Sequence, residues 1–173
     1  MGLQVPKIKN QNPKSAKNPN QPFDFKYIKI LIKRGSNSDK EPQEVFLERE
    51  WVQKNNTIPH FSNVIKNVDK HEGVEITMNC NSGAFHWIIA FVKIKTTMDD
   101  ELEAMKKSPM GVSKERRQDH NNLTEAQLYE KMDDIDNDNC LNILVTSYFL
   151  QLSWVYEKVW NYYFTRNFSE VIN

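Results

Sequence analysis

The sequence predicts an α+β domain in which a small three-stranded sheet packs with a cluster of about five helices. Residues 74–79, VEITMN, alternate apolar and polar side chains, which is typical of a half-buried strand. Residues 85–94 then change to a recurrence of three and four residues, the period of a helix. Residues 141–166 carry two more helical patterns in close succession, so runs of helices follow the strands.

A β-hairpin is predicted ahead of the strand at 74–79. Residues 23–33, FDFKYIKILIK, alternate over most of their length, and residues 44–51 follow after the turn sequence RGSNSD. Residues 57–68 then place apolar side chains three or four positions apart, and Pro59 suits the first turn of a helix. We therefore expect a hairpin and one short amphipathic helix before the third strand.

The helix predicted at 85–94 is apolar on two sides. Its first apolar row has the spacing i, i+3, i+4 and i+7, and its second row lies about 100° round the helix. These rows are Phe85, Ile88, Ile89 and Val92, and then Trp87, Phe91 and Ile94. A helix with two apolar sides must be covered twice, so we expect it to be central, with Trp87 and Phe91 in the core.

Residues 97–139 differ in composition from the rest and predict an insertion. They carry twelve Asp and Glu against six Lys and Arg, and few large apolar residues. Two helices are expected within them, at 99–107 and 124–132, and Thr124 with Gln127 matches a capping box for the second. A connection of this length docks a partner or stays mobile.

The C-terminal stretch predicts two helices in close succession. The first helix carries an apolar face made of Leu141, Leu144, Val145, Tyr148 and Leu152. Ser153 caps the second helix, whose buried row is Val155, Val159, Tyr162 and Tyr163. Four further aromatic residues either fill the core or form an interface: Trp154, Tyr156, Trp160 and Phe164.

Residues 1–22 predict a basic tail of the disordered type, ahead of the domain at 23–172. Residues 1–21 hold four lysines, Lys7, Lys9, Lys14 and Lys17, and no acidic residue. No aromatic residue lies among these lysines, so we expect no nucleic-acid partner. The tail is either solvated or lies as a peptide on an acidic protein partner.

Composition bears on compartment and on class. The 173 residues carry 23 basic and 23 acidic side chains, so the formal net charge is zero. No apolar run is long enough to span a bilayer and no leader-like pattern begins the chain, so we expect a soluble cytoplasmic protein without membrane contact. The two cysteines, Cys80 and Cys140, fit free buried thiols in a reducing compartment.

The strongest candidate for chemistry is the acidic run Asp134, Asp136 and Asp138. These residues match positions 1, 3 and 5 of an EF-hand loop over 134–145, but Asn139 stands where Gly is wanted and Val145 where Glu belongs. A solvated acidic loop is the other interpretation, and we favour it. The histidines and cysteines show no metal spacing, and no Gly-rich phosphate loop is present. We therefore expect no enzyme activity, no metal and no cofactor.

Two segments carry a resemblance to a known family. Residues 142–152, NILVTSYFLQL, with Val155, Val159 and Tyr162, resemble the signature of a BTB/POZ domain across its last paired helices. Ser147 stands where a small residue lets those helices close. Residues 74–80, VEITMNC, with residues 85–93, are similar to the divergent BTB domain of the SANT-and-BTB regulator of class-switch recombination family. The resemblance covers residues 25–172, interrupted by 97–139, and implies a BTB-like fold.

The resemblance implies a protein–protein interaction module, used as a scaffold or adaptor subunit. Such a module homodimerises or docks within a larger intracellular assembly, and a cytoskeletal or ciliary complex is one home for it. Two alternatives stay open. One is a calcium-responsive regulatory protein acting through residues 134–145. The other is a ubiquitin-ligase substrate adaptor, although no apolar-x-Glu cullin-contact motif follows the helix at 85–94.

Overall fold

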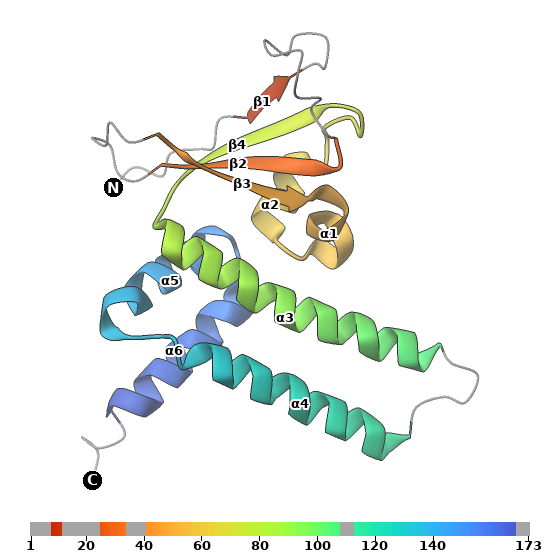
Figure 1. The fold of residues 1–173 in the computed structure, drawn as a ribbon, viewed down its shortest axis with the longest axis vertical. Coiled ribbons are helices and arrows are strands. Elements are labelled where there is room, and N and C mark those ends of the chain that lie inside the picture. The colour runs from red at the N-terminus through yellow and green to blue at the C-terminus, as the bar shows by residue number, and fades with distance from the viewer. Residues whose placement is uncertain (1–7, 12–24, 34–40, 108–112, 169–173) are drawn as a thin grey trace. The chain divides into compact units, whose positions relative to one another are not determined.

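The computed structural model describes residues 8–11, 25–33, 41–107 and 113–168 (Figure 1). The chain forms two compact units. The first comprises residues 1–82 and 148–152, and it holds a β-sheet with two short helices. The second comprises residues 83–147 and 153–173, and it is helical. The predicted α+β class is confirmed.

The sheet of the first unit has four strands in the order β1-β4-β2-β3. β2 (Tyr27–Lys33) and β3 (Gln43–Glu48) pair antiparallel, as the predicted hairpin requires. β4 (Gly73–Asn79) lies parallel to β2, and β1 (Ile8–Gln11) lies antiparallel to β4. The sheet thus contains the three predicted strands and one more.

The additional strand β1 lies within the tail that composition predicted to be disordered, so that prediction is wrong for these four residues. Polar composition reports on side-chain burial, whereas an edge strand is held through its backbone. One edge of β4 pairs with β2 and the other is free to pair with β1, where Lys9 lies opposite Glu75 in the backbone register. The rest of the tail, including Lys7, Lys14 and Lys17, lies outside the described residues.

Alternation along β2 and β4 places one face of the sheet in the core. Ile28, Ile30 and Ile32 are buried on β2, and Val74, Ile76 and Met78 are buried on β4. The parallel register puts Lys29 of β2 beside Glu75 of β4, and the ammonium of Lys29 pairs with the carboxylates of Glu75 and Glu44. The opposite face therefore carries a charge cluster across three strands.

Arg49 organises the segment between the hairpin and β4. It begins α1 (Arg49–Gln53), which is followed by the 3-10 turn η2 (Lys54–Asn56) and α2 (Pro59–Ile65). The guanidinium donates to the carbonyl oxygens of Val68 at 2.8 Å, Glu72 at 3.1 Å and Lys70 at 3.2 Å. Arg49 is buried, so these three bonds offset much of the cost of burying its charge, while its Nε atom is buried without a hydrogen-bond partner. Nothing in the apolar pattern pointed to this residue.

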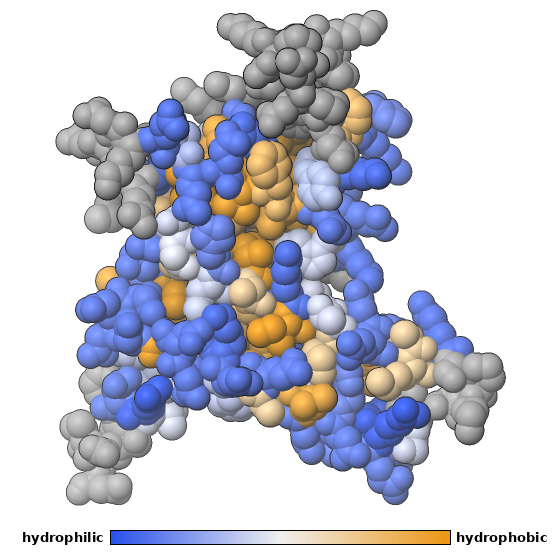
Figure 2. All heavy atoms as spheres, viewed as in Figure 1, coloured by the Kyte–Doolittle hydropathy of each residue, from blue (hydrophilic) through white to orange (hydrophobic). Residues whose placement is uncertain are grey.

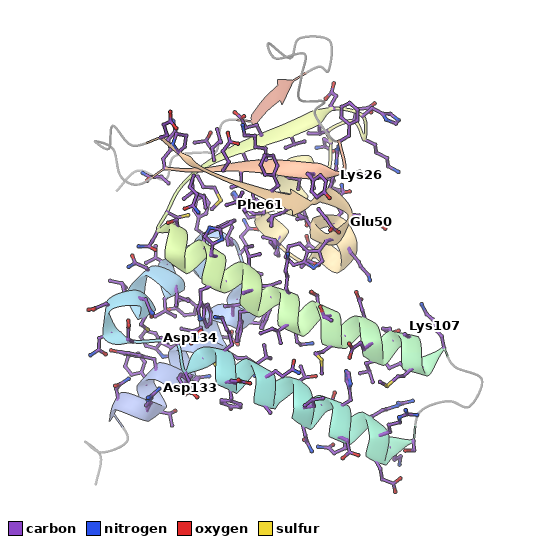
Figure 3. The ribbon with its side chains drawn as sticks, in the orientation of Figure 1. Lys26, Glu50, Phe61, Lys107, Asp133 and Asp134 are labelled. Carbon is purple, nitrogen blue, oxygen red and sulfur yellow. The ribbon has the colours of Figure 1, made fainter. Side chains whose placement is uncertain are left out.

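The segment 148–152 packs against α2 within the first unit. The backbone N–H of His60 donates to the carbonyl of Leu150 at 3.3 Å, and the His60 ring lies 4.7 Å from that of Phe149. Phe61 and Ile65 of α2 are fully buried, and Figure 3 labels Phe61 among the side chains of this unit. Burial lowers the pKa of the His60 imidazole, whose Nε2 atom is buried without a hydrogen-bond partner.

The described part of the second unit is built from four helices: α3 (Ser82–Lys106), α4 (Lys114–Met132), α5 (Asn137–Phe149) and α6 (Ser153–Phe168). Ser82 and the last two residues of α5 belong to the first unit. The helix predicted at 85–94 continues without a break through the helix expected at 99–107. Pairs such as Lys95 with Asp99 support this exposed extension at helical spacing. The insertion at 97–139 is therefore largely helical, and Figure 2 shows hydrophilic side chains at the outer ends of its helices.

α4 begins ten residues before the start predicted for it, and its capping residue is Ser113, not Thr124. The Ser113 hydroxyl accepts from the N–H of Arg116 at 3.2 Å. Thr124 is buried inside the helix, and its hydroxyl donates to the carbonyl of His120. His120 in turn forms a hydrogen bond with the Met98 carbonyl of α3 at 2.7 Å.

Among the described residues, no helix is long and apolar enough to cross a membrane.

The prediction that Trp87 and Phe91 lie in the core is confirmed. The two rings stack at 4.8 Å, and Phe91 stacks at 5.6 Å on Trp154 of α6. The Trp87 indole N–H donates to the Lys131 carbonyl near the end of α4 at 3.3 Å. With the contact between Met98 and His120, this fixes α3 and α4 as an antiparallel pair (Figure 1).

Replacing Arg49 by alanine is expected to lower the free energy of unfolding by about 2–4 kcal/mol, because three carbonyls lose a charged donor and the buried side chain leaves a gap. Urea denaturation measures this. Arg49→Lys should recover only a part of the loss, since one ammonium cannot span three separate carbonyls. The matched control is Glu50→Ala, one residue along α1 and exposed, which should change stability by less than about 0.5 kcal/mol. Equal effects of the Arg49 and Glu50 variants would refute the assignment.

Stability should fall as the pH drops below 6.5 through His60. The pKa of this imidazole is lowered in the folded chain, so below pH 6.5 the unfolded chain binds more protons and is favoured. His60→Phe keeps a ring against Phe149 and removes the titration. Denaturation at pH 5.0 to 7.5 should show a flatter pH dependence for this variant than for the wild type. An unchanged slope would assign the effect to other groups.

Candidate interaction surface

The outer side of α5 carries exposed apolar side chains. Leu141, Val145 and Tyr148 are 69%, 60% and 76% exposed, and their spacing of i, i+4 and i+7 places them on one face. We call them the α5 row. Because α5 is one continuous helix, the helix itself sets their alignment. An exposed row at this spacing is typical of a helix that packs against a further element.

The apolar face predicted for this helix therefore divides in two. Leu144 and Leu152 are buried as expected, whereas the three residues of the α5 row are not, so that part of the prediction is wrong. Cys140, Ile143 and Ser147 are buried in their place. The helix is apolar nearly all round, and periodicity cannot tell which apolar side meets the core.

α6 carries an aromatic series beside its buried row. Val155 and Val159 are fully buried. Tyr156, Trp160 and Phe164 follow at intervals of four residues, with ring centroids 6.1 Å and 4.0 Å apart, and Trp160 is 41% exposed. We call these three residues the α6 ladder. Trp154, the fourth aromatic of the predicted interface, is half-buried and stacks on the buried Phe91 instead.

The α5 row and the α6 ladder lie on neighbouring helices. The hydroxyl of Tyr163 on α6 bonds the side-chain oxygen of Asn137, in the first turn of α5. On α6 the ring centroids of Tyr163 and Phe164 are 6.0 Å apart. On α5 Leu141 lies one turn beyond Asn137, on the same side of the helix. The last turns of α6, which carry Phe164, therefore lie against the first turn of α5, one turn before Leu141. We call the two together the α5–α6 face.

The charge along this segment is entirely negative. Between residues 133 and 157 the chain has five acidic side chains and no lysine or arginine. The nearest cations are already paired: Lys131 with Asp134, Lys158 with Glu125, and Arg166 with Asp133. Asp138 and Glu157 form no ion pair within the described chain. The α5–α6 face is therefore apolar with an acidic border.

The acidic run at 134–138 begins a helix. The Asp136 carboxylate accepts from the backbone N–H groups of Asp138 at 3.0 Å and Asn139 at 2.8 Å, while the Asn139 side chain accepts from the Asp136 N–H. This is a reciprocal N-cap for α5. Asp134 pairs with Lys131, and Figure 3 labels Asp133 and Asp134 just after α4.

This geometry leaves the calcium interpretation without a ligand loop. Residues 137–145 lie in α5, so most of the twelve positions proposed for an EF-hand loop are helical. Asp134 pairs with Lys131 and Asp136 caps α5, so these carboxylates and that of Asp138 do not form a ligand set. No group of three His, Cys, Asp or Glu side chains in the described parts of the chain is arranged to hold a metal ion. The spacing Asp136-x-x-Asn139 is that of a capping box, so this helix start is a local feature of the sequence.

The two thiols and the Tyr162 hydroxyl are set against ionisation. Burial raises the pKa of Cys80 to about 11, and burial together with the nearby Asp136 carboxylate raises the pKa of Cys140. Thiols of this kind stay protonated and are poor nucleophiles. The hydrogen bond to Asp133 raises the pKa of Tyr162, which holds that hydroxyl as a donor.

Comparison of the chain with family models, with curated proteins and with solved structures gave no match in any of the three. The case for a function therefore comes from the surface of the molecule and from the pattern of its residues.

Replacing Asp136 by alanine should destabilise the chain by about 1 kcal/mol, because two N–H groups at the start of α5 lose their acceptor. Asp134→Asn is the control, since an exposed ion pair is worth about 0–1 kcal/mol. Thermal unfolding measures both. Millimolar calcium should leave both midpoints, and that of the wild type, unchanged. A calcium-dependent rise in the wild type that Asp136→Ala abolishes would restore the metal interpretation.

Proposed function

We propose that this chain is a non-enzymatic, BTB-like protein–protein interaction module that serves as a scaffold or adaptor subunit of a larger assembly. The order of elements supports the proposal: a hairpin, short helices, a strand parallel to the first hairpin strand, and then helices that end in a closed pair. Ser147 and Val159 are both fully buried, in keeping with their place in the BTB signature. A small side chain at position 147 favours close approach of the paired helices.

The observation that carries the proposal is the α5–α6 face. Its exposed members are large apolar and aromatic residues on rigid helices, the kind that supply most of the binding energy at protein contacts. Covering Leu141, Val145 and Tyr148 would remove from water three side chains that are now more than half exposed. At roughly 25 cal/mol per Å² of apolar surface, such burial stabilises a complex appreciably.

The proposal assigns no chemical step to the chain. Its two thiols have raised pKa values, and its acidic run is used in helix capping and ion pairs. The function then lies in joining other proteins, as a homodimer or as a subunit of a stable complex. An intracellular assembly of cytoskeletal or ciliary type belongs to the same proposal.

The test compares the native assembly of the wild type with that of a face variant, Leu141→Ser with Val145→Ser. The wild-type chain should elute from size-exclusion chromatography of a native extract at a mass well above its own 20.4 kDa. The face variant should elute near the monomer mass and keep its helical circular dichroism, because it loses only exposed apolar side chains. Leu123→Ser on α4, also exposed, is the matched control and should elute with the wild type.

A face variant that remains in the large assembly would contradict the use of this face. A wild-type chain that elutes as a monomer in the native extract would contradict the proposed function as a whole.

A further inference from the structure

We propose that the α5–α6 face binds one amphipathic helix of a partner protein, with lysine or arginine residues flanking an apolar row. This inference rests on the proposed function and adds the chemistry of the partner. It is argued from the shape of the exposed apolar row and from the sign of the charge around it.

The spacing of the α5 row favours a helix as the occupant. Leu141, Val145 and Tyr148 form a straight ridge over two turns, roughly 10 Å long at 1.5 Å per residue. Residues at i, i+4 and i+7 are the anchors through which one helix packs along another. An extended peptide would instead need an open strand edge, and α5 has none. The α6 ladder adds aromatic area beside this ridge.

The charge around the face selects a basic partner. Asp138 lies one turn before Leu141 on α5, and Glu157 lies one turn before Trp160 on α6. Both are exposed, and neither forms an ion pair among the described residues, since Lys131, Lys158 and Arg166 pair elsewhere. Lysine or arginine residues on a docked helix would meet these two carboxylates at the border of the apolar contact.

The same charge disfavours other occupants. A second copy of this chain would bring a face with the same acidic border against this one, and like charges cost energy at a self-complementary contact. Anionic membrane surfaces and nucleic acids bind faces rich in lysine and arginine, and residues 133–157 have neither. An apolar row with an acidic border is therefore best matched by an amphipathic helix with basic flanks.

Three synthetic peptides of about 18 residues test this with the full chain. The first is an amphipathic helix with a Leu and Trp row flanked by lysines. The second keeps that row and has glutamate in place of each lysine. The third has the composition of the first in an order without amphipathicity. Fluorescence anisotropy at two salt concentrations gives the dissociation constants, and sedimentation velocity of the chain alone gives its oligomeric state.

The basic amphipathic peptide should bind at least about tenfold more tightly than either of the others. Asp138→Asn with Glu157→Gln should weaken its binding several-fold and reduce the salt dependence, because two charge contacts are lost. Leu141→Ser with Val145→Ser should weaken it more than about tenfold, whereas Leu123→Ser should not. Circular dichroism of each variant checks that the helices persist.

Equal binding of the acidic peptide, or of the basic peptide without amphipathic order, would overturn the inference. So would a dimer of the chain that Leu141→Ser with Val145→Ser abolishes, because the occupant would then be a second copy. In either case the native assembly can still depend on Leu141 and Val145, and the proposed function would stand with another partner. If that assembly is also insensitive to the face variant, both the inference and the use of the α5–α6 face fail.

Discussion

The packing of the helices in the second unit depends on the contacts of Trp87. Its ring stacks on Phe91, which stacks on Trp154 of α6, and its indole N–H donates to the Lys131 carbonyl near the end of α4. The aromatic stack supplies apolar area without direction, whereas this hydrogen bond and the one between His120 and the Met98 carbonyl fix where α4 lies along α3. Three helices are therefore held together by one buried side chain and its neighbours.

This arrangement also accounts for what stays exposed. α6 meets α3 through Trp154 and meets the end of α4 through Tyr162 and Asp133, so its remaining aromatic side faces outward. One side of α5 is buried through Cys140, Ile143, Leu144 and Ser147. Its outer row is apolar although the described chain does not cover it. A helix that is apolar on both sides yet covered on one is typical of an interface.

In the first unit a polar side chain, Arg49, joins segments that are distant in sequence. Its guanidinium donates to three carbonyls of residues 68–72, and these bonds hold the segment that leads from α2 to the start of β4. β4 then accepts β2 on one edge and β1 on the other. Both contacts join segments far apart in sequence, and neither leaves a periodic trace, because a guanidinium and a strand edge bind backbone groups whatever the side chains are.

The types of secondary-structure element and much of the buried core could be predicted from the order of the amino acids. Alternation identified β2 and β4, and the double apolar row placed Trp87 and Phe91 in the interior, since periods of 2.0 and 3.6 are local properties of the chain. The caps of α4 and α5 are local as well, since Ser113 accepts from the N–H of Arg116 and Asp136 accepts from that of Asn139, but apolar periodicity carries no information about caps. Which apolar side of α5 is covered, and that residues 8–11 add a strand, emerged only from the fold, because both depend on partners distant in sequence.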